Sequence, residues 1–495
     1  MKKTLLLLSL VGLTSICACK NKKKESRAPV KIADGSSPVG ITTMFELHYR
    51  YTPEIDSLQR YLSPQMQRQA ALMWNYIREL TTIDLWVFPA EHIPGTAYRA
   101  RTAGCARGKG RKLIAVLLKT PNGKPMVIKE GAVYSFSNKN LEGGQEYSVM
   151  DNGKRLCIAS SRELLVKAMG WKPLAAKSQG HFLDLILNTP SLFASRSFLG
   201  RGDNYLEQIA SRAGDQKPNV LAFFSAIKEI KLVRLDFQLS KQAGITLTAP
   251  LFFPRENRLP SIAAKTVSLV DRLCTDCMIE AAVPLSGGKL WGFSIKPFLS
   301  QVPNPVVKRF LTAGLEKIEH LHVSAVKTER QLHVLPRVTA QLHEIPPMLL
   351  EQILDSLKDI PGVPPLQLVK SADDAQSAKF IWDRSRENQT SLFTDLFGEK
   401  GEMKTRIGNS RFYCNRKSTG LAKQSGIHLL LRPFSLARLY LSLASKGTPP
   451  QGFQSESPET EPPVRISLTG DPSQHALVFS LSVPLGLWLE YSRKY

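Results

Sequence analysis

An alternation of apolar and polar residues is the clearest pattern in the chain. In residues 233–239 every odd position is Val, Leu or Phe and every even position is Arg, Asp or Gln, and an apolar run returns at 245–247 after a turn that contains glycine. Because side chains two apart on a strand point to the same face, the pattern predicts an antiparallel hairpin with its apolar face buried. Comparable hairpins are predicted over 318–335 and 464–483.

Helix signals lie between some of the predicted strands. Ser63 followed by Pro64 predicts the start of a helix. Ser160, with Glu163 three positions later, forms a capping box that predicts a short helix ending at Gly170. Hairpins and helices together predict an α+β fold in which helices pack on antiparallel sheets.

Proline-rich stretches divide the chain into three folded modules behind a leader. We expect a signal peptide at 1–18, a basic flexible tether at 19–40, and α+β modules at 41–254, 255–360 and 361–495, the last with a flexible insertion at 447–463. Segments 226–230 and 314–318 resemble each other, which suggests that the modules are diverged repeats. The alternative is that the segments are unrelated, because any amphipathic hairpin alternates apolar and polar residues with a period of two and so resembles any other.

The first residues have the composition of a signal peptide. Lys2 and Lys3 precede an apolar run from Leu5 to Ile16, which matches a positive n-region followed by an apolar h-region. This run is too short for a membrane span, which needs about 20 apolar residues. We therefore expect the segment to be cleaved and the rest of the chain to be exported.

The end of this segment carries a family resemblance. Ile16-Cys17-Ala18-Cys19 resembles the lipobox of bacterial lipoproteins, in which an aliphatic, a loosely specified and a small residue precede the lipidated cysteine. The resemblance covers only the start of the chain and implies lipidation of Cys19, with Cys17 unusual at its position. Lys20 stands where an Asp retains many such proteins in the inner membrane, which implies outer-membrane sorting. The alternative is ordinary cleavage after Ala18, which leaves a soluble secreted protein.

The chain is strongly basic, with a formal net charge of +24, or +22 once Lys2 and Lys3 leave with the signal peptide. An exported protein of this charge meets anionic lipid, lipopolysaccharide or glycan, and we expect no nucleic-acid partner. The alternative is a cationic, solvated surface without a dedicated ligand. One basic, glycine-containing segment could receive phosphate or sulfate, unless it is a solvated loop. Its candidate anion-binding residues are Arg101, Arg107, Lys109, Arg111 and Lys112.

Five cysteines remain beyond the signal peptide and Cys19, and an odd number cannot all pair. The size of the chain and its low cysteine content argue against a framework held by disulfides. Cys274 and Cys277 are close enough in sequence to form a local disulfide in an oxidising compartment. The alternatives are a redox-active pair, which the flanking sequence does not favour, and reduced thiols in the core.

Three histidines are the best candidates for a metal site. His320 and His322 are two apart on a predicted strand and so share a face, and a turn near 326–329 would place His333 opposite His322. Imidazole nitrogen suits zinc and other borderline metals. The alternative is a solvated sheet face that carries histidines by chance.

The sequence contains no P-loop, no dinucleotide-binding glycine motif, no GxSxG nucleophile elbow and no HExxH zinc motif. We therefore assign no catalytic residue and no cofactor, and favour a non-enzymatic lipoprotein that binds or scaffolds components of the cell envelope. Its first partner would be the membrane, reached through the lipid anchor. The alternative is a hydrolase or metal-dependent enzyme that acts on envelope polymers, for which the histidines or scattered acidic residues would have to converge.

Overall fold

The structure, a computed structural model, describes residues 43–61, 78–91, 99–111, 127–138, 145–172, 178–194, 229–240, 244–271, 277–294, 318–327, 334–345, 366–370, 377–383, 400–406, 408–414, 421–437 and 461–486, with short pieces and single residues elsewhere. Of the described residues, 56% lie in strands and 21% in helices. The protein is therefore mostly β. No helix among the described residues combines the length and the apolar composition that a membrane span requires.

The predicted α+β fold, with helices packed on antiparallel sheets, is wrong. The hairpins recognised in the sequence are parts of long antiparallel ladders, and each neighbouring hairpin extends the ladder. The described α-helices are short: α4 (Arg162–Gly170), α5 (Thr189–Ala194) and α9 (Leu259–Lys265) have 9, 6 and 7 residues. A 3-10 helix, η1, spans Pro53–Tyr61.

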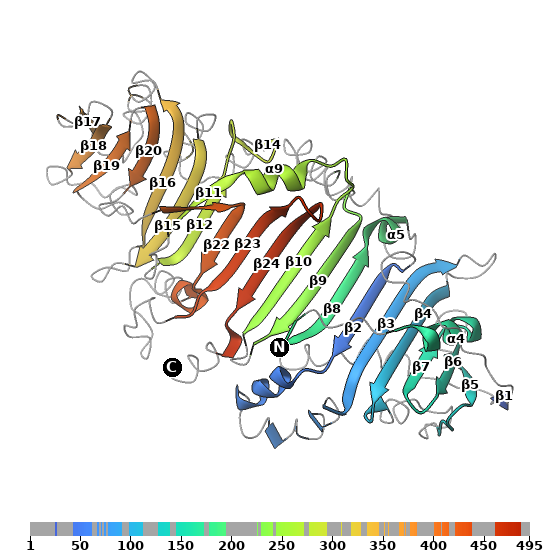
Figure 1. Ribbon diagram of the computed structural model, residues 1–495. Helices are drawn as coiled ribbons and strands as arrows, with labels where there is room; N and C mark the ends of the chain where they lie inside the picture. Colours follow the sequence, from blue (N-terminus) through green and yellow to red (C-terminus); the bar gives the residue numbers. More distant parts are fainter. Residues whose placement is uncertain are drawn as a thin grey trace. The chain divides into compact units, whose positions relative to one another are not determined.

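The chain folds into two compact units, of which the first comprises residues 1–205 and 230–249 and the second residues 206–229 and 250–495. The strands of the first unit are β1 (Glu25–Ser26), β2 (Phe45–Arg50), β3 (Leu80–Glu91), β4 (Arg99–Gly108), β5 (Val133–Asn138), β6 (Gln145–Asp151), β7 (Arg155–Ala159), β8 (His181–Asn188), β9 (Leu232–Leu239) and β10 (Ile245–Phe252). They pair antiparallel in the order β1–β5–β6–β7–β4–β3–β2–β8–β9, with β10 beside β9 (Figure 1).

The second unit is also built on an antiparallel ladder. Its strands are β12 (Cys277–Pro284), β15 (Ile318–Lys327), β16 (Val334–Ile345), β17 (Leu366–Lys370), β18 (Ser377–Asp383), β19 (Lys400–Arg406), β20 (Gly408–Cys414), β22 (Ile427–Leu431), β23 (Val464–Asp471) and β24 (Ala476–Val483). They pair antiparallel in the order β17–β18–β19–β20–β16–β15–β12–β22–β23–β24. Two small sheets lie outside this ladder: β11 (Val267–Asp271) with β21 (Leu421–Ser425), and β13 (Lys289–Leu290) with β14 (Phe293–Ser294).

The predicted boundary between residues 255–360 and 361–495 cuts through this second ladder. Strand β16 lies before the boundary and pairs with β20 after it, and β12 pairs with β22 in the same way. The middle and C-terminal modules are therefore parts of one sheet, because strands distant in sequence complete each other's hydrogen bonds.

The two units share one strand connectivity. In each, three successive strands form a meander (β2, β3, β4 and β12, β15, β16), and a second meander returns to pair with the third of them through β7 or β20. A last strand group then pairs on the other side of the first strand, as β8–β9 or β22–β23. Segments 226–230 and 314–318 do not correspond, since one precedes β9 and the other ends at the first residue of β15.

The core of the first unit lies between its sheet and helix α4. Trp86 of β3 meets Trp171 edge to face, with ring centroids 4.8 Å apart, and both residues are buried. A disulfide joins Cys105 of β4 to Cys157 of β7, which lie directly opposite each other. Both cysteines belong to the same buried cluster as the two tryptophans, so the disulfide is part of the core.

Helix α4 begins one residue later than the capping box predicted. The N-cap is Ser161, whose Oγ accepts a hydrogen bond from the Leu164 main-chain N–H at 3.1 Å. Ser160 instead accepts a hydrogen bond from the Thr102 main-chain N–H at 3.0 Å. The two serines therefore have separate tasks, one that caps the helix and one that holds its start against β4.

Candidate functional site

A row of four ionisable residues crosses the sheet of the first unit. Asp84 of β3 lies opposite His48 of β2, His48 opposite Asp184 of β8, and Asp184 opposite Asp236 of β9. Directly opposed residues of antiparallel strands project from the same face. All four are at most 5% exposed. The buried face of this sheet therefore carries a continuous line of charged or polar side chains.

This arrangement reverses the face predicted for the hairpin at 233–247. Asp236 is buried, whereas Val233, Leu235 and Phe237 on the opposite face are only half-buried, and of the predicted apolar face only Leu239 at the end of β9 is buried. The prediction rested on the alternation of residue types, which placed the apolar face inside, and burying the charged face instead is costly for an isolated charge. Here each buried charged side chain contacts another of opposite sign, and this pairing offsets the cost.

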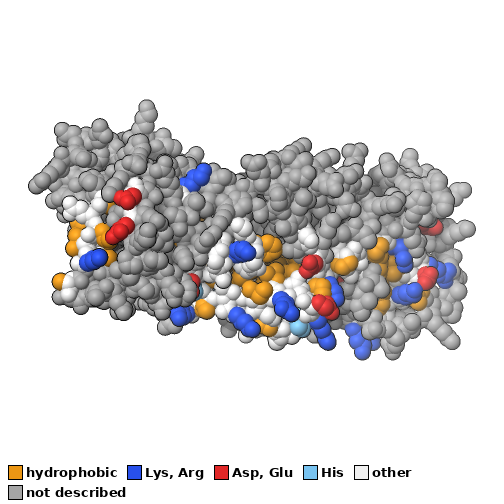
Figure 2. All heavy atoms as spheres, turned by 90° about the horizontal axis from the view of Figure 1, so that it is seen from above, with side chains coloured by type: hydrophobic (Ala, Val, Ile, Leu, Met, Phe, Trp, Pro, Cys, Tyr) orange, Lys and Arg blue, Asp and Glu red, His pale blue; other side chains and the backbone are white. Residues whose placement is uncertain are grey.

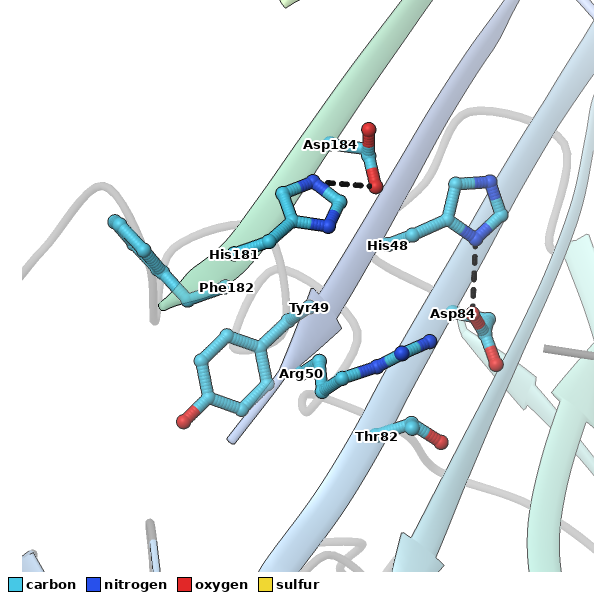
Figure 3. Close-up of a pocket in the computed structure, with 8 residues that line it drawn as sticks. All are labelled: His48, Tyr49, Arg50, Thr82, Asp84, His181, Phe182 and Asp184. Atoms are coloured by element: carbon cyan, nitrogen blue, oxygen red, sulfur yellow. Dashed lines mark hydrogen bonds and ion pairs between the residues drawn. The ribbon is translucent and has the colours of Figure 1, made fainter. Parts of the chain in front are cut away.

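His48 joins two carboxylates. Its Nδ1 lies 2.8 Å from Asp84 Oδ1 (Figure 3), and its Nε2 lies 2.8 Å from Glu46 Oε2. Thr43 donates its hydroxyl to the other oxygen of Glu46. Burial lowers the pKa of His48, but the hydrogen bonds to Asp84 and Glu46 outweigh it and raise the pKa to about 9. Both ring nitrogens therefore act as donors, and the ring is an imidazolium at neutral pH.

His181 and Arg234 contact the two carboxylates at the other end of the row. His181 Nε2 lies 3.1 Å from Asp184 Oδ2. Arg234 donates from Nη2 to Asp184 Oδ1 at 2.8 Å and from Nε to Asp236 Oδ1 at 2.8 Å. Burial, followed by a hydrogen bond with Asp236, raises the pKa of Asp184 against the opposing effect of Arg234. The two carboxylates thus form a coupled pair that one guanidinium bridges.

A pocket opens beside this row where β2 ends and β3 and β8 begin. It is lined by His48, Tyr49, Arg50, Thr82, Asp84, His181, Phe182 and Asp184 (Figure 3). Three buried polar atoms of these residues, Tyr49 Oη, Thr82 Oγ1 and Asp84 Oδ2, have no hydrogen-bond partner among the described residues. Buried polar groups are nearly always satisfied by protein, water or ions. The pocket therefore offers hydrogen-bonding atoms that suit a bound water or a small polar ligand.

The second unit buries a related pair. His322 Nε2 lies 2.9 Å from Glu280 Oε1, and the two residues are 2% and 4% exposed. When Glu46 and Glu280 are aligned in the common connectivity, His322 takes the place of Asp84. The same alignment matches Arg234 with Arg465, because each lies two strands away from its glutamate in the same register.

The three histidines predicted to hold a metal are not brought together as expected. Strand β15 continues to Lys327 and β16 returns at Val334, so the residue opposite His322 is Thr339. His333 lies outside the described residues, and His320 is half-buried. The predicted turn at 326–329 was too early along the chain, and a shift in register moves every pairing with it.

The predicted anion-binding residues do not form a loop that converges on one point. Arg101 and Arg107 lie in β4, where Arg101 stacks over the Phe88 ring at 5.9 Å and Arg107 donates to the Trp171 carbonyl at 3.2 Å. Arg111 pairs with Asp151 at 3.2 Å. Lys109 is exposed, and Lys112 lies outside the described residues. The guanidinium groups are thus used within the fold.

The cysteines depart in part from prediction. The disulfide between Cys105 and Cys157 was missed, because the two are 52 residues apart and only the pairing of β4 with β7 brings them together. Cys277 is disulfide-bonded. Cys274 and Cys19 lie outside the described residues, so the Cys274–Cys277 bond and the lipidation of Cys19 stay predictions.

The buried charged row was not recognised in the sequence, although a signal was present. Asp84, Asp184 and Asp236 are each flanked on both sides by apolar residues within a predicted or observed strand. An acidic residue that recurs in this context on several strands indicates a shared polar face.

Comparisons of the chain with protein-family models, curated proteins and solved structures find no match.

Proposed function

We propose that the chain is an exported lipoprotein of a bacterial envelope, anchored through Cys19, whose folded body binds or scaffolds envelope components. The observation that carries this proposal is the buried disulfide between Cys105 and Cys157. Disulfides persist in oxidising compartments and are rare in the cytosol. This agrees with the signal-peptide composition of residues 1–18 and with the Ile16-Cys17-Ala18-Cys19 motif.

The binding role is supported by the breadth of the sheets and by charge. The chain has a formal net charge of +24, which favours anionic lipid, lipopolysaccharide or glycan as partners outside the cytoplasm. In the coloured parts of Figure 2, Lys and Arg side chains lie among acidic and apolar ones. A surface of this kind suits broad contact with a polymer or membrane more than a single phosphate pocket.

The anchor is tested by labelling cells that express the full chain with a palmitate analogue. We expect the wild-type protein to take up label and to fractionate with membranes, and Cys19→Ser to lose both properties. Cys17→Ser is the matched control, because it removes a thiol two residues away and should leave labelling unchanged. Equal labelling of the wild type and Cys19→Ser would contradict the proposed anchor.

Export itself is tested by whether Cys105 and Cys157 are oxidised in the cell. Thiol alkylation of cells without reductant, followed by peptide mass analysis, should recover the peptides of Cys105 and Cys157 as one linked species. Free, alkylated thiols at both positions in the native host would contradict export to an oxidising compartment.

A second function class, a metal-dependent enzyme acting on envelope polymers, has one observation in its favour. His181 and Asp184 line a pocket beside the buried row, and pockets with convergent ionisable groups are the usual location of active sites. Degradation of purified wall polymer by the wild type, lost in His181→Ala, would favour this class over binding alone.

A further inference from the structure

We infer that His181, Asp184 and Asp236 form a binding site for a divalent cation of the zinc type. One potential ligand atom from each residue lies within 4.8 Å of the other two, and all three residues are buried. Imidazole nitrogen and carboxylate oxygen are zinc ligands, and three protein ligands leave a position open for water or a further ligand. This set differs from the histidines that the sequence pointed to.

The backbone of β8 places His181 in this set. His181 and Asp184 are three residues apart, so on a regular strand they would point to opposite faces. The pairing of β8 with β9 shifts register between His181 and Leu183, and such a bulge redirects the side chains before it. His181 is thereby brought to the face of Asp184, and its Nε2 lies 3.1 Å from Asp184 Oδ2. Bulges of this kind are frequent beside functional sites.

The charges around the three ligands favour a cation. Arg234 donates to the Oδ1 atoms of both Asp184 and Asp236, which fixes the carboxylates as outer hydrogen-bond partners do in metal sites. The His181 imidazole and the two carboxylates converge at one buried place, and nitrogen and oxygen donors of these types are ligands of a divalent cation.

A buried, unsatisfied polar atom in the pocket is a second, independent observation that points to a bound ligand. Asp84 is 2% exposed, and its Oδ2 atom has no hydrogen-bond partner among the described residues. It lines the same pocket as His181 and Asp184 (Figure 3). A water held by the cation would lie in a pocket whose wall also carries Thr82 Oγ1, likewise unsatisfied among these residues.

The second unit provides an internal comparison. With Glu46 aligned to Glu280, the places of Asp184 and Asp236 are taken by His428 and Ser467. The carboxylate pair is therefore specific to the first unit, and His428→Ala is a matched control for changes at β8.

The test is a titration of the purified full chain with ZnCl2 after treatment with a chelator. We expect one ion per chain, and a loss of affinity of roughly tenfold or more in His181→Ala and Asp236→Asn, by analogy with changes around zinc ligands. His428→Ala should bind as the wild type does. Zinc should also raise the unfolding temperature of the wild type and of His428→Ala, because it binds only the folded state.

X-ray absorption of the zinc-loaded wild type gives a readout that does not depend on the folding of any variant. The proposed site predicts oxygen and nitrogen ligands with one imidazole. No binding to the folded wild type, two or more imidazoles, or sulfur ligation would overturn it. Binding kept in His181→Ala but lost in His322→Ala would also overturn it, since the ion would then lie in the second unit. Each outcome is independent of acylation at Cys19.

Discussion

His48 and Asp84 lie directly opposite each other on neighbouring strands, and the imidazole Nδ1 is 2.8 Å from the carboxylate Oδ1. The second ring nitrogen contacts Glu46 at the same distance. One buried cation thus joins two buried carboxylates of the first unit, and the stability of that unit becomes dependent on the protonation of one ring.

The first prediction concerns pH. The pKa of His48 is lowered by burial but raised more by Asp84 and Glu46, from 6.5 to about 9. Because the folded-state pKa is the higher one, the contribution of the protonated ring is complete below about pH 6.5 and is lost as the pH rises through about 9. At about 1.4 kcal/mol per pKa unit the loss amounts to roughly 3 kcal/mol.

Urea unfolding between pH 6 and pH 10 measures this loss. His48→Gln should be less stable than the wild type at low pH and should lack the decline above about pH 6.5. In His428→Gln, whose parent ring donates to the Ser425 carbonyl at 2.8 Å, the decline should persist. A wild-type stability that stays level from pH 6 to pH 10 would refute the account of His48.

The second prediction concerns Arg234. Arg234→Met removes the guanidinium that contacts Asp184 and Asp236, and leaves two buried carboxylates facing each other. Removing one partner from a buried ion pair costs about 3–5 kcal/mol in free energy of unfolding. Lys167→Ala is the contrasting variant, because its pair with Glu163 is exposed and water screens such pairs, so that the free energy of unfolding should hardly change. Equal losses in the two variants would argue against a buried charged row.

The third prediction concerns Gly180, which precedes His181 with a φ of +75°. A Cβ at this position would overlap the Leu239 carbonyl oxygen, so Gly180→Ala must displace the start of β8. Gly131 has a φ of +78° but nothing within 4 Å of a built Cβ. Gly131→Ala should therefore cost only the backbone strain of about 1–2 kcal/mol, and Gly180→Ala roughly 1–3 kcal/mol more. Thermal unfolding of the two variants measures the difference, and equal stability would contradict the close approach.

The fourth prediction concerns the disulfide. The bond between Cys105 and Cys157 spans 52 residues, and a loop of that length is stabilised by roughly 4 kcal/mol in the chain-entropy description. The double variant Cys105→Ala and Cys157→Ala should unfold at lower denaturant concentration than the wild type. Added reductant should destabilise the wild type without a further effect on the first unit of the double variant. A wild type that is insensitive to reductant, with accessible thiols, would contradict the bond.

Strand positions were largely predictable because the alternation of residue types survives in the fold. The predicted hairpins at 233–247 and 464–483 are the strand pairs β9–β10 and β23–β24. What the alternation could not provide was which strands pair across long separations. The pairing of β4 with β7 and of β12 with β22 depends on closing long loops, and no local pattern in the sequence encodes it.

The site was missed for a related physical reason. Asp236 lies on the polar face of the predicted hairpin, and such a face is expected to meet solvent because an isolated acidic side chain is expensive to bury. Arg234 lies two residues before Asp236 on β9, and only the register of β8 against β9 brings it to Asp184 as well. The same dependence on register explains His322, whose neighbour across β16 is Thr339 and not His333.

The central claim, an exported and lipid-anchored protein, is tested most directly by the mass of the N-terminal peptide isolated from the native host. The account predicts that the chain begins at Cys19 and carries acyl groups there. A cytosolic chain that still begins at Met1, or a mature chain that begins at Cys19 without acyl groups, would contradict it.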